Sequence, residues 1–283
     1  MNPQTRPNPI VGRDTKFPYM VAVVCWIDLL GYGAMIAEAD FNPLRLKASD
    51  AVRRLRRFHE IVASHSGREF PTLVMNDGAA AYRDLSLRSR EPSYDFLMSA
   101  WDLFQEIKRD ENEKELPGAR LVLATGFRMH GRRTGLDAKA AHLKSVMQRF
   151  KSGDIAAEEA IREAANIRQS FDIIPHLQAN FAFTKAYVAE STGKGGGLAG
   201  PNFFVDLALF DSPTPEWVVA GKTVRWSHTR LRMSASFAPI LALHPNGKFK
   251  GYPHGIRDGL QVAAHLSGDP EVLKALRAAQ KAR

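Results

Sequence analysis

A run of apolar, β-favouring residues at positions 19–27 constrains the fold of this chain most. An almost unbroken run of this kind is typical of a strand that is buried on both faces of a sheet. The run ends at the isolated carboxylate Asp28, Gly31 and Gly33 follow closely, and the pattern then changes to helical spacing. The sequence therefore predicts a central strand whose carboxyl end carries an acidic side chain beside a glycine-containing turn.

Asp28 has two interpretations. A carboxylate at the end of a central strand, next to a turn that begins a helix, is well placed to hold a divalent cation and the phosphates that the cation bridges. Aspartate is also a common cap of the helix that follows such a turn. The stretch around Asp28 does not by itself distinguish the two.

Asp77 is a second carboxylate in a comparable position. Residues 70–75 and 79–85 both have strand composition, and Asn76-Asp77-Gly78 lies between them. Asp-Gly between two strand-like runs is a strong signal for a β-hairpin, so the simplest role of Asp77 is that of a turn residue. The presence of Asp28 at the end of the first strand favours a joint role for the two carboxylates.

The rest of the chain contains both helical and strand patterns. We expect helices near 34–64 (interrupted at Asn42-Pro43), 92–110, 136–168 (broken near 152–154), 173–190 and 271–283, and strands near 119–129, 202–210 and 216–225. The predicted organisation is a disordered lead at 1–17, an α+β domain at 18–210 with a helical insertion at about 136–170, and a C-terminal extension at 211–283 that packs on the core. Residues 226–256 show no clear period.

Composition narrows the class of protein. The 283 residues carry a formal charge of +9, which favours polyanionic partners such as nucleotides or nucleic acid only weakly. A single cysteine, Cys25, excludes an internal disulfide and a cysteine-based zinc site. No apolar run reaches the ~20 residues that span a bilayer, and no signal-peptide pattern is present, so we expect a cytoplasmic protein without a membrane partner.

Several common chemistries lack their motifs. Residues 193–197 contain four glycines and one lysine but do not match a phosphate-binding loop, because Gly195 stands where Ser or Thr is required. The histidines show no His-Glu-x-x-His spacing, and no Gly-x-Ser-x-Gly motif indicates a serine hydrolase. We therefore interpret residues 193–197 as a linker.

The order of these features resembles the catalytic core of class III nucleotidyl cyclases, which is related to the palm domain of polymerases. The resemblance rests on Ile27-Asp28-x-x-Gly31-Tyr32, on Asn76-Asp77-Gly78 in a hairpin, and on a strand that ends near Gly131. Residues 183–190 and 201–206 are similar to a divergent bacterial branch, with an Ala-Tyr-x-x-Glu helix and a proline-led strand. Some relatives of that branch make cyclic nucleotide signals in anti-phage defence.

The resemblance implies a fold and a ligand set. The fold is α+β, with a ferredoxin-like or palm-type, mostly antiparallel sheet, helices on one face, a helical insertion and a C-terminal extension. From the resemblance we expect a nucleoside triphosphate as substrate and a homodimer as the active form. Asp28, Asp77 and the carbonyl of Leu29 would bind Mg²⁺ or Mn²⁺. The phosphates would be held by Leu30, Gly31, Tyr32 and Gly33, with Asn76 beside them.

The catalytic half of the family pattern is missing. Class III cyclases carry an Asn and an Arg four residues apart on the helix before the last core strand. Aligning that helix on Glu190 puts Thr184 and Val188 at these positions, and aligning it on Asn180 puts Thr184 at the arginine position. We take Arg128 and Lys185 as candidate substitutes for the missing arginine.

Two alternatives therefore stay open. One is a catalytically degenerate cyclase-like module that binds a nucleotide or a protein partner. The other, less favoured, is a basic nucleic-acid-binding protein. Its phosphate contacts would come from the arginines at 53–57 and from the basic residues of the last helix. Such binding would weaken steeply with salt.

Overall fold

The computed structural model describes residues 19–129, 138–170, 174–244 and 254–281. The predicted disordered lead at 1–17 and the predicted strand end at Gly131 lie outside these residues. None of the helices in the described ranges is both long and apolar enough to cross a membrane.

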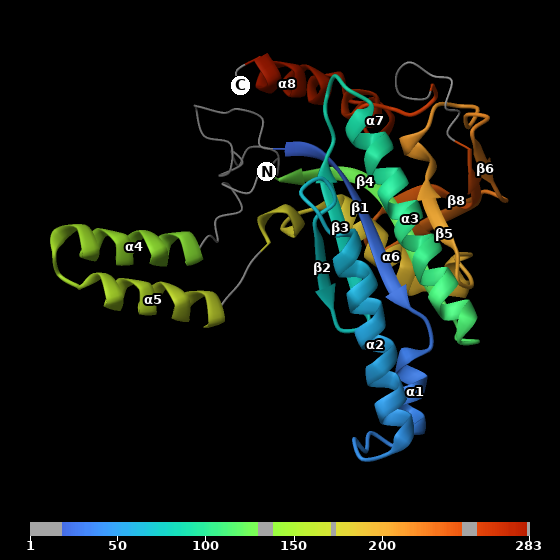
Figure 1. Ribbon diagram of the computed structural model, residues 1–283. Coiled ribbons are helices and arrows are strands. Elements are labelled where there is room, and N and C mark those ends of the chain that lie inside the picture. The colour runs from blue at the N-terminus through green and yellow to red at the C-terminus, as the bar shows by residue number, and fades with distance from the viewer. Residues whose placement is uncertain (1–18, 130–137, 171–173, 245–253, 282–283) are drawn as a thin grey trace, which may run out of the picture.

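An eight-stranded sheet forms the centre of the molecule (Figure 1), with the order β2-β3-β1-β4-β5-β8-β6 and with β7 paired to β8. The strands are β1 Tyr19–Leu29, β2 Thr72–Met75, β3 Gly78–Asp84, β4 Ala119–Met129, β5 Phe203–Asp206, β6 Val218–Ala220, β7 Val224–His228 and β8 Met233–Leu243. All pairings are antiparallel except that of β4 with β5.

The first four strands have a recognisable topology. β1 lies between β3 and β4, and the chain runs β1, two helices, β2, β3, one helix, β4. This order of connections and the antiparallel pairing are those of the ferredoxin-like unit. The predicted α+β class with a mostly antiparallel, ferredoxin-like sheet is therefore confirmed, including the hairpin that carries Asp77. The prediction of helices on one face is wrong, because helices cover both faces of the sheet.

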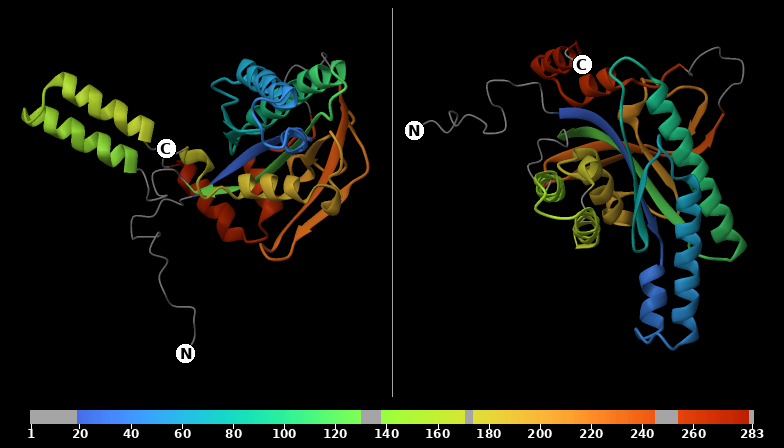
Figure 2. Two further views of the ribbon diagram at one scale, coloured as in Figure 1. Left: turned by 90° about the horizontal axis from the view of Figure 1, so that it is seen from below. Right: turned by 60° about the vertical axis from the view of Figure 1, so that its left-hand side comes forward.

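Alternate residues of β1 face two hydrophobic layers. One face packs on α2 (Leu46–His65) and α3 (Glu91–Glu113), which lie side by side in Figures 1 and 2. Val24 and Trp26 face the other side, where α6 (Phe181–Thr192) covers them. A strand with apolar residues on both faces needs a cover on both, and α6 provides the second layer.

The remaining helices comprise one next to α2, two at the end of the chain that pack on the main core through residues such as Val262 and Leu276, and a separate hairpin. α1 (Tyr32–Glu38) precedes α2, and α7 (Gly259–Leu266) and α8 (Pro270–Lys281) end the chain. α4 (Ala138–Ser152) and α5 (Ala157–Ser170) form a hairpin around a small core of their own, which includes Val146 and Ala160. Figure 2 shows this hairpin away from the sheet. Asp269 caps α8, because its carboxylate accepts the N–H of Glu271.

β8 lies in the region where the sequence showed no clear period. It contains Pro239, which lacks an N–H and usually argues against a strand inside a sheet. Here Pro239 lies opposite Phe204 of β5, and its carbonyl still accepts the N–H of Gly221. The tertiary pairing of β8 with three other strands therefore outweighs its weak local pattern.

Candidate functional site

Asp28 is the next-to-last residue of β1, the strand that lies between β3 and β4 in the sheet. It lies opposite Gly78 of β3 and Arg120 of β4. Because side chains alternate along a strand, Asp28 projects to the same face as Trp26, which is the face that α6 covers. The first turn of the next helix is capped by Gly31, without a side-chain hydrogen bond. The capping interpretation of Asp28 is therefore wrong.

The β2–β3 hairpin brings Asp77 to Asp28. The N–H of Leu29 donates to the carbonyl of Asp77 at 2.9 Å, and Gly78 pairs directly with Asp28. The pKa of Asp28 is raised to about 6, first by burial and then by the negative charges of Glu190 and Asp77. Two carboxylates from distant parts of the chain therefore converge at the end of β1.

Arg120 and Glu190 complete the charged group, and the sequence analysis did not single them out as site residues. Arg120 donates to Glu190 Oε1 from Nε at 2.9 Å and from Nη2 at 2.6 Å, and Nη1 donates to the carbonyl of Leu198. Both side chains are largely buried. The sequence held two signals for these residues. Glu190 ends the Ala-Tyr-x-x-Glu motif, and Arg120 is one of two charged residues in the mostly apolar strand β4.

The expectation that Arg128 substitutes for the missing catalytic arginine is contradicted. Arg128 lies opposite Met20, at the other end of β4, eight residues from Arg120, or about 26 Å along a strand. Its guanidinium is bound to both carboxylate oxygens of Asp84 and to the carbonyl of Met129. It is therefore too far from Asp28 to act on the same ligand.

The expectation that Lys185 substitutes for the missing arginine is also contradicted, because Lys185 is likewise distant from Asp28. Its Nζ donates to Asp206 Oδ2 at 2.9 Å, and the same oxygen accepts from Thr125 of β4. Thr125 is five residues from Arg120, about 16 Å along the strand. Lys185 therefore belongs to a different group of charges.

The turn after β1 differs in part from the predicted phosphate cradle. The N–H of Leu30 donates to the carbonyl of Gly118 at 2.9 Å, so it is not available to a phosphate. The prediction that Leu30 helps to bind the phosphates is therefore wrong. Among the described residues, no acceptor faces the N–H groups of Gly31, Tyr32 and Gly33. Gly31 has a positive φ of 76°, and a Cβ there would lie 3.0 Å from Pro117. Glycine therefore suits this turn.

Asn76 and Tyr32 lie next to Asp77. Asn76 donates from Nδ2 to Asp77 Oδ1 at 2.9 Å, and its carbonyl contacts His59 Nε2 at 2.7 Å. The pKa of the Tyr32 hydroxyl is raised by burial and by the charge of Asp77. Tyr32 and Asn76 therefore both border the Asp77 carboxylate.

Aromatic side chains form the wall of the site on the α6 side. Trp26 packs edge-on against Phe183 and Tyr187, with ring centroids 5.9 Å and 5.1 Å apart. The buried indole N–H of Trp26 has no acceptor among the described residues. Tyr187 is 47% exposed, so it presents a free ring edge at the surface close to Glu190.

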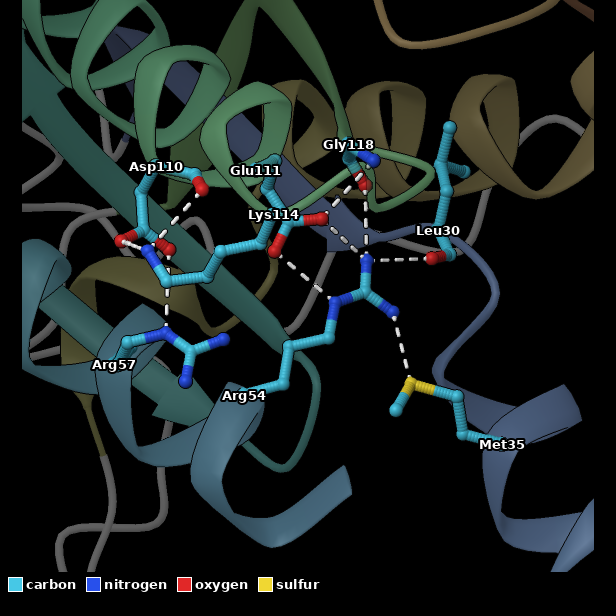
Figure 3. A network of polar contacts seen from close by, with 8 residues as sticks. All are labelled: Leu30, Met35, Arg54, Arg57, Asp110, Glu111, Lys114 and Gly118. Carbon is cyan, nitrogen blue, oxygen red and sulfur yellow. Dashed lines mark hydrogen bonds and ion pairs between the residues drawn. The ribbon is translucent and has the colours of Figure 1, made fainter. Parts of the chain in front are cut away.

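A buried ion pair supports the backbone behind the site (Figure 3). Arg54 of α2 donates to both carboxylate oxygens of Glu111 of α3, at 3.0 and 2.6 Å. Arg54 also donates to the carbonyl of Leu30, and Glu111 accepts the N–H of Gly118. The pair therefore fixes the turn after Asp28 and the residue before β4.

The donors at the site fit a hard divalent cation that also contacts a ligand. Mg²⁺ in nucleotide sites is commonly held by one or two carboxylates together with substrate phosphates. Asp28, Asp77 and the carbonyl of Leu29 match that chemistry. Within the described residues, no group of three or more His, Cys, Asp or Glu side chains is arranged to hold a metal alone.

The comparisons with known proteins concern structure only. No family model and no curated protein sequence matches the chain. One similar solved structure is the guanylyl cyclase Cya2, with 9% identity, a TM-score of 0.44 and coverage of 83% of this chain and 97% of that chain.

Two further structures are similar. A bacterial light-regulated adenylyl cyclase has 10% identity, a TM-score of 0.41 and coverage of 88% of this chain and 56% of that chain. The non-canonical dimeric guanylyl cyclase domain of a RhoGC fusion protein from the aquatic fungus Blastocladiella emersonii has 11% identity, a TM-score of 0.37 and coverage of 80% and 96%. All three are cyclase structures, at low identity to this chain.

Proposed function

We propose that the protein is a divalent-metal-dependent nucleotidyl cyclase or nucleotidyltransferase that acts on nucleoside triphosphates. The observation that carries this proposal is the convergence of Asp28 and Asp77 at the carboxyl end of β1. The burial that raises the pKa of Asp28 disfavours its charged form, and so does the neighbouring charge of Asp77. A bound cation would relieve this repulsion.

The cyclisation step places specific demands on the site. The ribose 3′-hydroxyl oxygen forms a bond to the α-phosphorus, its proton passes to solvent water, and the bond from the α-phosphorus to the bridging oxygen breaks so that pyrophosphate leaves. Bound Mg²⁺ or Mn²⁺ would supply activation of the hydroxyl and neutralisation of phosphate charge. Asp28 and Asp77 would hold the metal, and the N–H groups of residues 31–33 would orient the phosphates.

Arg120 is the cationic candidate in place of Arg128 and Lys185. It lies opposite Asp28 on the adjacent strand, and its guanidinium is oriented by Glu190. The exposed ring of Tyr187 would contact the base of the bound ligand. The homodimer and a role in anti-phage signalling stay predictions.

A second candidate is a cyclase-like module that binds a nucleotide without turnover. The pairing of Arg120 with Glu190 favours it, because a guanidinium bound to a carboxylate has less charge to offer a developing phosphate anion. This candidate predicts nucleotide binding that depends on Asp28 and yields no product.

Incubation of the protein with the four ribonucleoside triphosphates and Mn²⁺, followed by mass spectrometry, tests both candidates. We expect pyrophosphate and a cyclic or linear nucleotide product with the wild type, and neither with Asp28→Asn or Asp77→Asn. Asp50→Asn is the matched control, because Asp50 forms an exposed ion pair on α2. Turnover that survives in both Asp28→Asn and Asp77→Asn would show that the proposed metal site is wrong.

Calorimetry separates the two candidates when no product forms. Tight nucleotide binding by the wild type that is lost in Asp28→Asn would select the binding module. Absence of both product and nucleotide binding would exclude both candidates.

A further inference from the structure

A cavity of about 670 Å³ lies where β5 leaves the sheet. β5 pairs with β8 only through Phe204, Val205 and Asp206, and the chain then turns into a 3₁₀ helix at Leu207–Leu209. The β8 residues from Met233 to Ser236 pair with β7 instead. The cavity is bounded by these segments together with α6 and α7.

Lys185 brings a buried positive charge to this cavity. It is 6% exposed, and one of its N–H groups donates to Asp206 Oδ2. The Asp206 carboxylate also accepts from Thr125 N, Thr125 Oγ1 and the N–H of Ala208. Asp206 therefore has its acceptors filled, whereas the ammonium group of Lys185, with three N–H donors, has no second acceptor among the described residues.

Two arginines add further donors. Arg257 donates from Nε to Asp211 and from Nη1 to the carbonyl of Ala208, both at 3.2 Å, and its Nη2 has no acceptor among the residues that the structure describes. Arg225 lines the cavity from β7, and within the described part of the chain its side chain has no ion pair and no hydrogen bond. A guanidinium carries five N–H donors, so both residues have spare capacity.

Serine hydroxyls lie beside these cations. Arg225 is directly opposite Ser236, and Ser227 is opposite Ser234, across the β7–β8 pair. All four residues line the cavity. Among the described residues that line the cavity, the two carboxylates are Asp206 and Asp211, and both are already paired. The cavity therefore has an excess of donors over acceptors and an excess of positive charge.

We propose that this cavity is a binding site for a small phosphorylated metabolite, with the phosphate held by Arg225, Arg257 and Lys185. Charged N–H donors bind phosphate oxygens strongly, and arginine does so in a bidentate manner. Cavities of about 300–1,000 Å³ are typical of small-molecule sites, so the volume exceeds what a bare phosphate ion needs. The hydroxyls of Ser227, Ser234 and Ser236 are placed to contact the rest of such a ligand.

The cavity is separate from the Asp28 site. Thr125, which contacts the Lys185–Asp206 pair, lies about 16 Å along β4 from Arg120. Without metal, the carboxylates of Asp28 and Asp77 repel a phosphate, whereas the cavity attracts one. An experiment without metal therefore reports phosphate binding in the cavity and not at the Asp28 site. The failure of either proposal, cyclase activity or phosphate binding in the cavity, leaves the other intact.

Isothermal titration calorimetry in EDTA, with inorganic phosphate, ribose 5-phosphate and neutral ribose as probes, tests the proposal. We expect ribose 5-phosphate to bind more tightly than phosphate, and ribose not to bind. Arg225→Gln should weaken ribose 5-phosphate binding by about tenfold, since one hydrogen bond to a charged group contributes about that factor. Arg225 is exposed, so the variant should fold.

Arg230→Gln is the matched control, because Arg230 is an exposed arginine in the turn after β7 and does not line the cavity. The affinity of Arg230→Gln for ribose 5-phosphate should equal that of the wild type. The proposal is overturned if neither phosphate compound binds the wild type at about 10 mM, a limit weaker than any useful site. Equal weakening in Arg225→Gln and Arg230→Gln would also overturn it, because it would indicate only general attraction to a basic surface.

Discussion

Arg54 and Glu111 form an ion pair in which both side chains are almost completely buried, with 1% and 3% of their surface exposed. The pair joins α2 to α3 and extends by hydrogen bonds to Leu30 and Gly118 (Figure 3). Leu30 follows the strand end that carries Asp28, and Gly118 precedes the strand that carries Arg120. One buried pair therefore determines the spacing of the backbone on both sides of the site.

The first prediction concerns this pair. Arg54→Met removes one partner and leaves the Glu111 charge buried without its cation, so the free energy of unfolding should fall by about 3–5 kcal/mol. The double variant Arg54→Met/Glu111→Leu should recover much of that loss, because no unpaired charge is left. Urea denaturation followed by circular dichroism measures both. Arg53→Met is the control, since Arg53 forms an exposed pair, and a loss in Arg54→Met no larger than in the control would contradict the prediction.

The second prediction concerns pH. Burial and the charges of Glu190 and Asp77 raise the pKa of Asp28 from 3.8 to about 6 in the folded protein. As the pH rises from about 4 to about 6, the unfolded chain loses this proton before the folded protein does, so the folded protein loses stability over that window. Asp28→Asn removes this cost. Above pH 6, the variant should be more stable than the wild type by about 1–2 kcal/mol, a value lower than the full pKa shift implies because solvent partly screens Asp28. At pH 4 or below, the two proteins should be equally stable.

Urea titrations in EDTA at pH 4 and pH 7.5 measure this difference. Asp50→Asn should show no comparable gain at either pH, because Asp50 forms only an exposed pair on α2. A gain in Asp28→Asn that is the same at both pH values would mean that packing, rather than the ionisation of Asp28, is responsible.

The third prediction concerns metal. If Asp28 and Asp77 hold Mg²⁺ or Mn²⁺, the ion binds the folded protein only, and it should stabilise the wild type by about 2.7 kcal/mol at a concentration 100 times its dissociation constant. Differential scanning fluorimetry with increasing MnCl₂ should show a rising melting temperature for the wild type and a smaller or absent rise for Asp28→Asn and Asp77→Asn. An equal rise in all three proteins would place the metal elsewhere.

Local sequence patterns were sufficient for the first part of the sheet. The apolar run of β1, the Asp-Gly turn and the amphipathic α3 each depend on residues close together in the chain, so these elements, with Asp28 at the end of a strand and Asp77 in a hairpin, could be predicted. The ferredoxin-like arrangement of the strands was implied by the resemblance to class III cyclases. β8 was missed, because small polar residues and Pro239 hide a strand that only its partners stabilise.

The charged partners depend on contacts over long sequence distances. Arg120 and Glu190 are 70 residues apart and meet only because α6 packs over β4. Arg128 and Lys185 were predicted as cationic substitutes, Lys185 being one residue from the family's arginine position in one register. The structure instead pairs them with Asp84 and Asp206, and no local pattern connects either carboxylate to its partner. The carboxylates of the candidate site, Asp28 and Asp77, could thus be predicted from the sequence, whereas its basic residue, Arg120, could not.

The last prediction tests the packing that brings Glu190 to the site. Gly126 of β4 lies directly beneath the start of α6, and a Cβ added there would lie 2.5 Å from the backbone nitrogen and 2.9 Å from the Cα of Ala182. Backbone atoms cannot yield as a flexible side chain does, so Gly126→Ala should push α6 away from the sheet. We expect the free energy of unfolding to fall by about 1–3 kcal/mol, the usual cost of overpacking.

Gly67→Ala is the matched control, because a Cβ at Gly67 would meet nothing within 4 Å, and its stability should stay close to that of the wild type. Displacement of α6 should also separate Glu190 from Arg120 and remove one of the negative charges that raise the pKa of Asp28. NMR titration of the Asp28 carboxyl in Gly126→Ala should therefore give a lower pKa than in the wild type. An unchanged pKa together with unchanged stability would mean that β4 and α6 do not approach as closely as the structure shows.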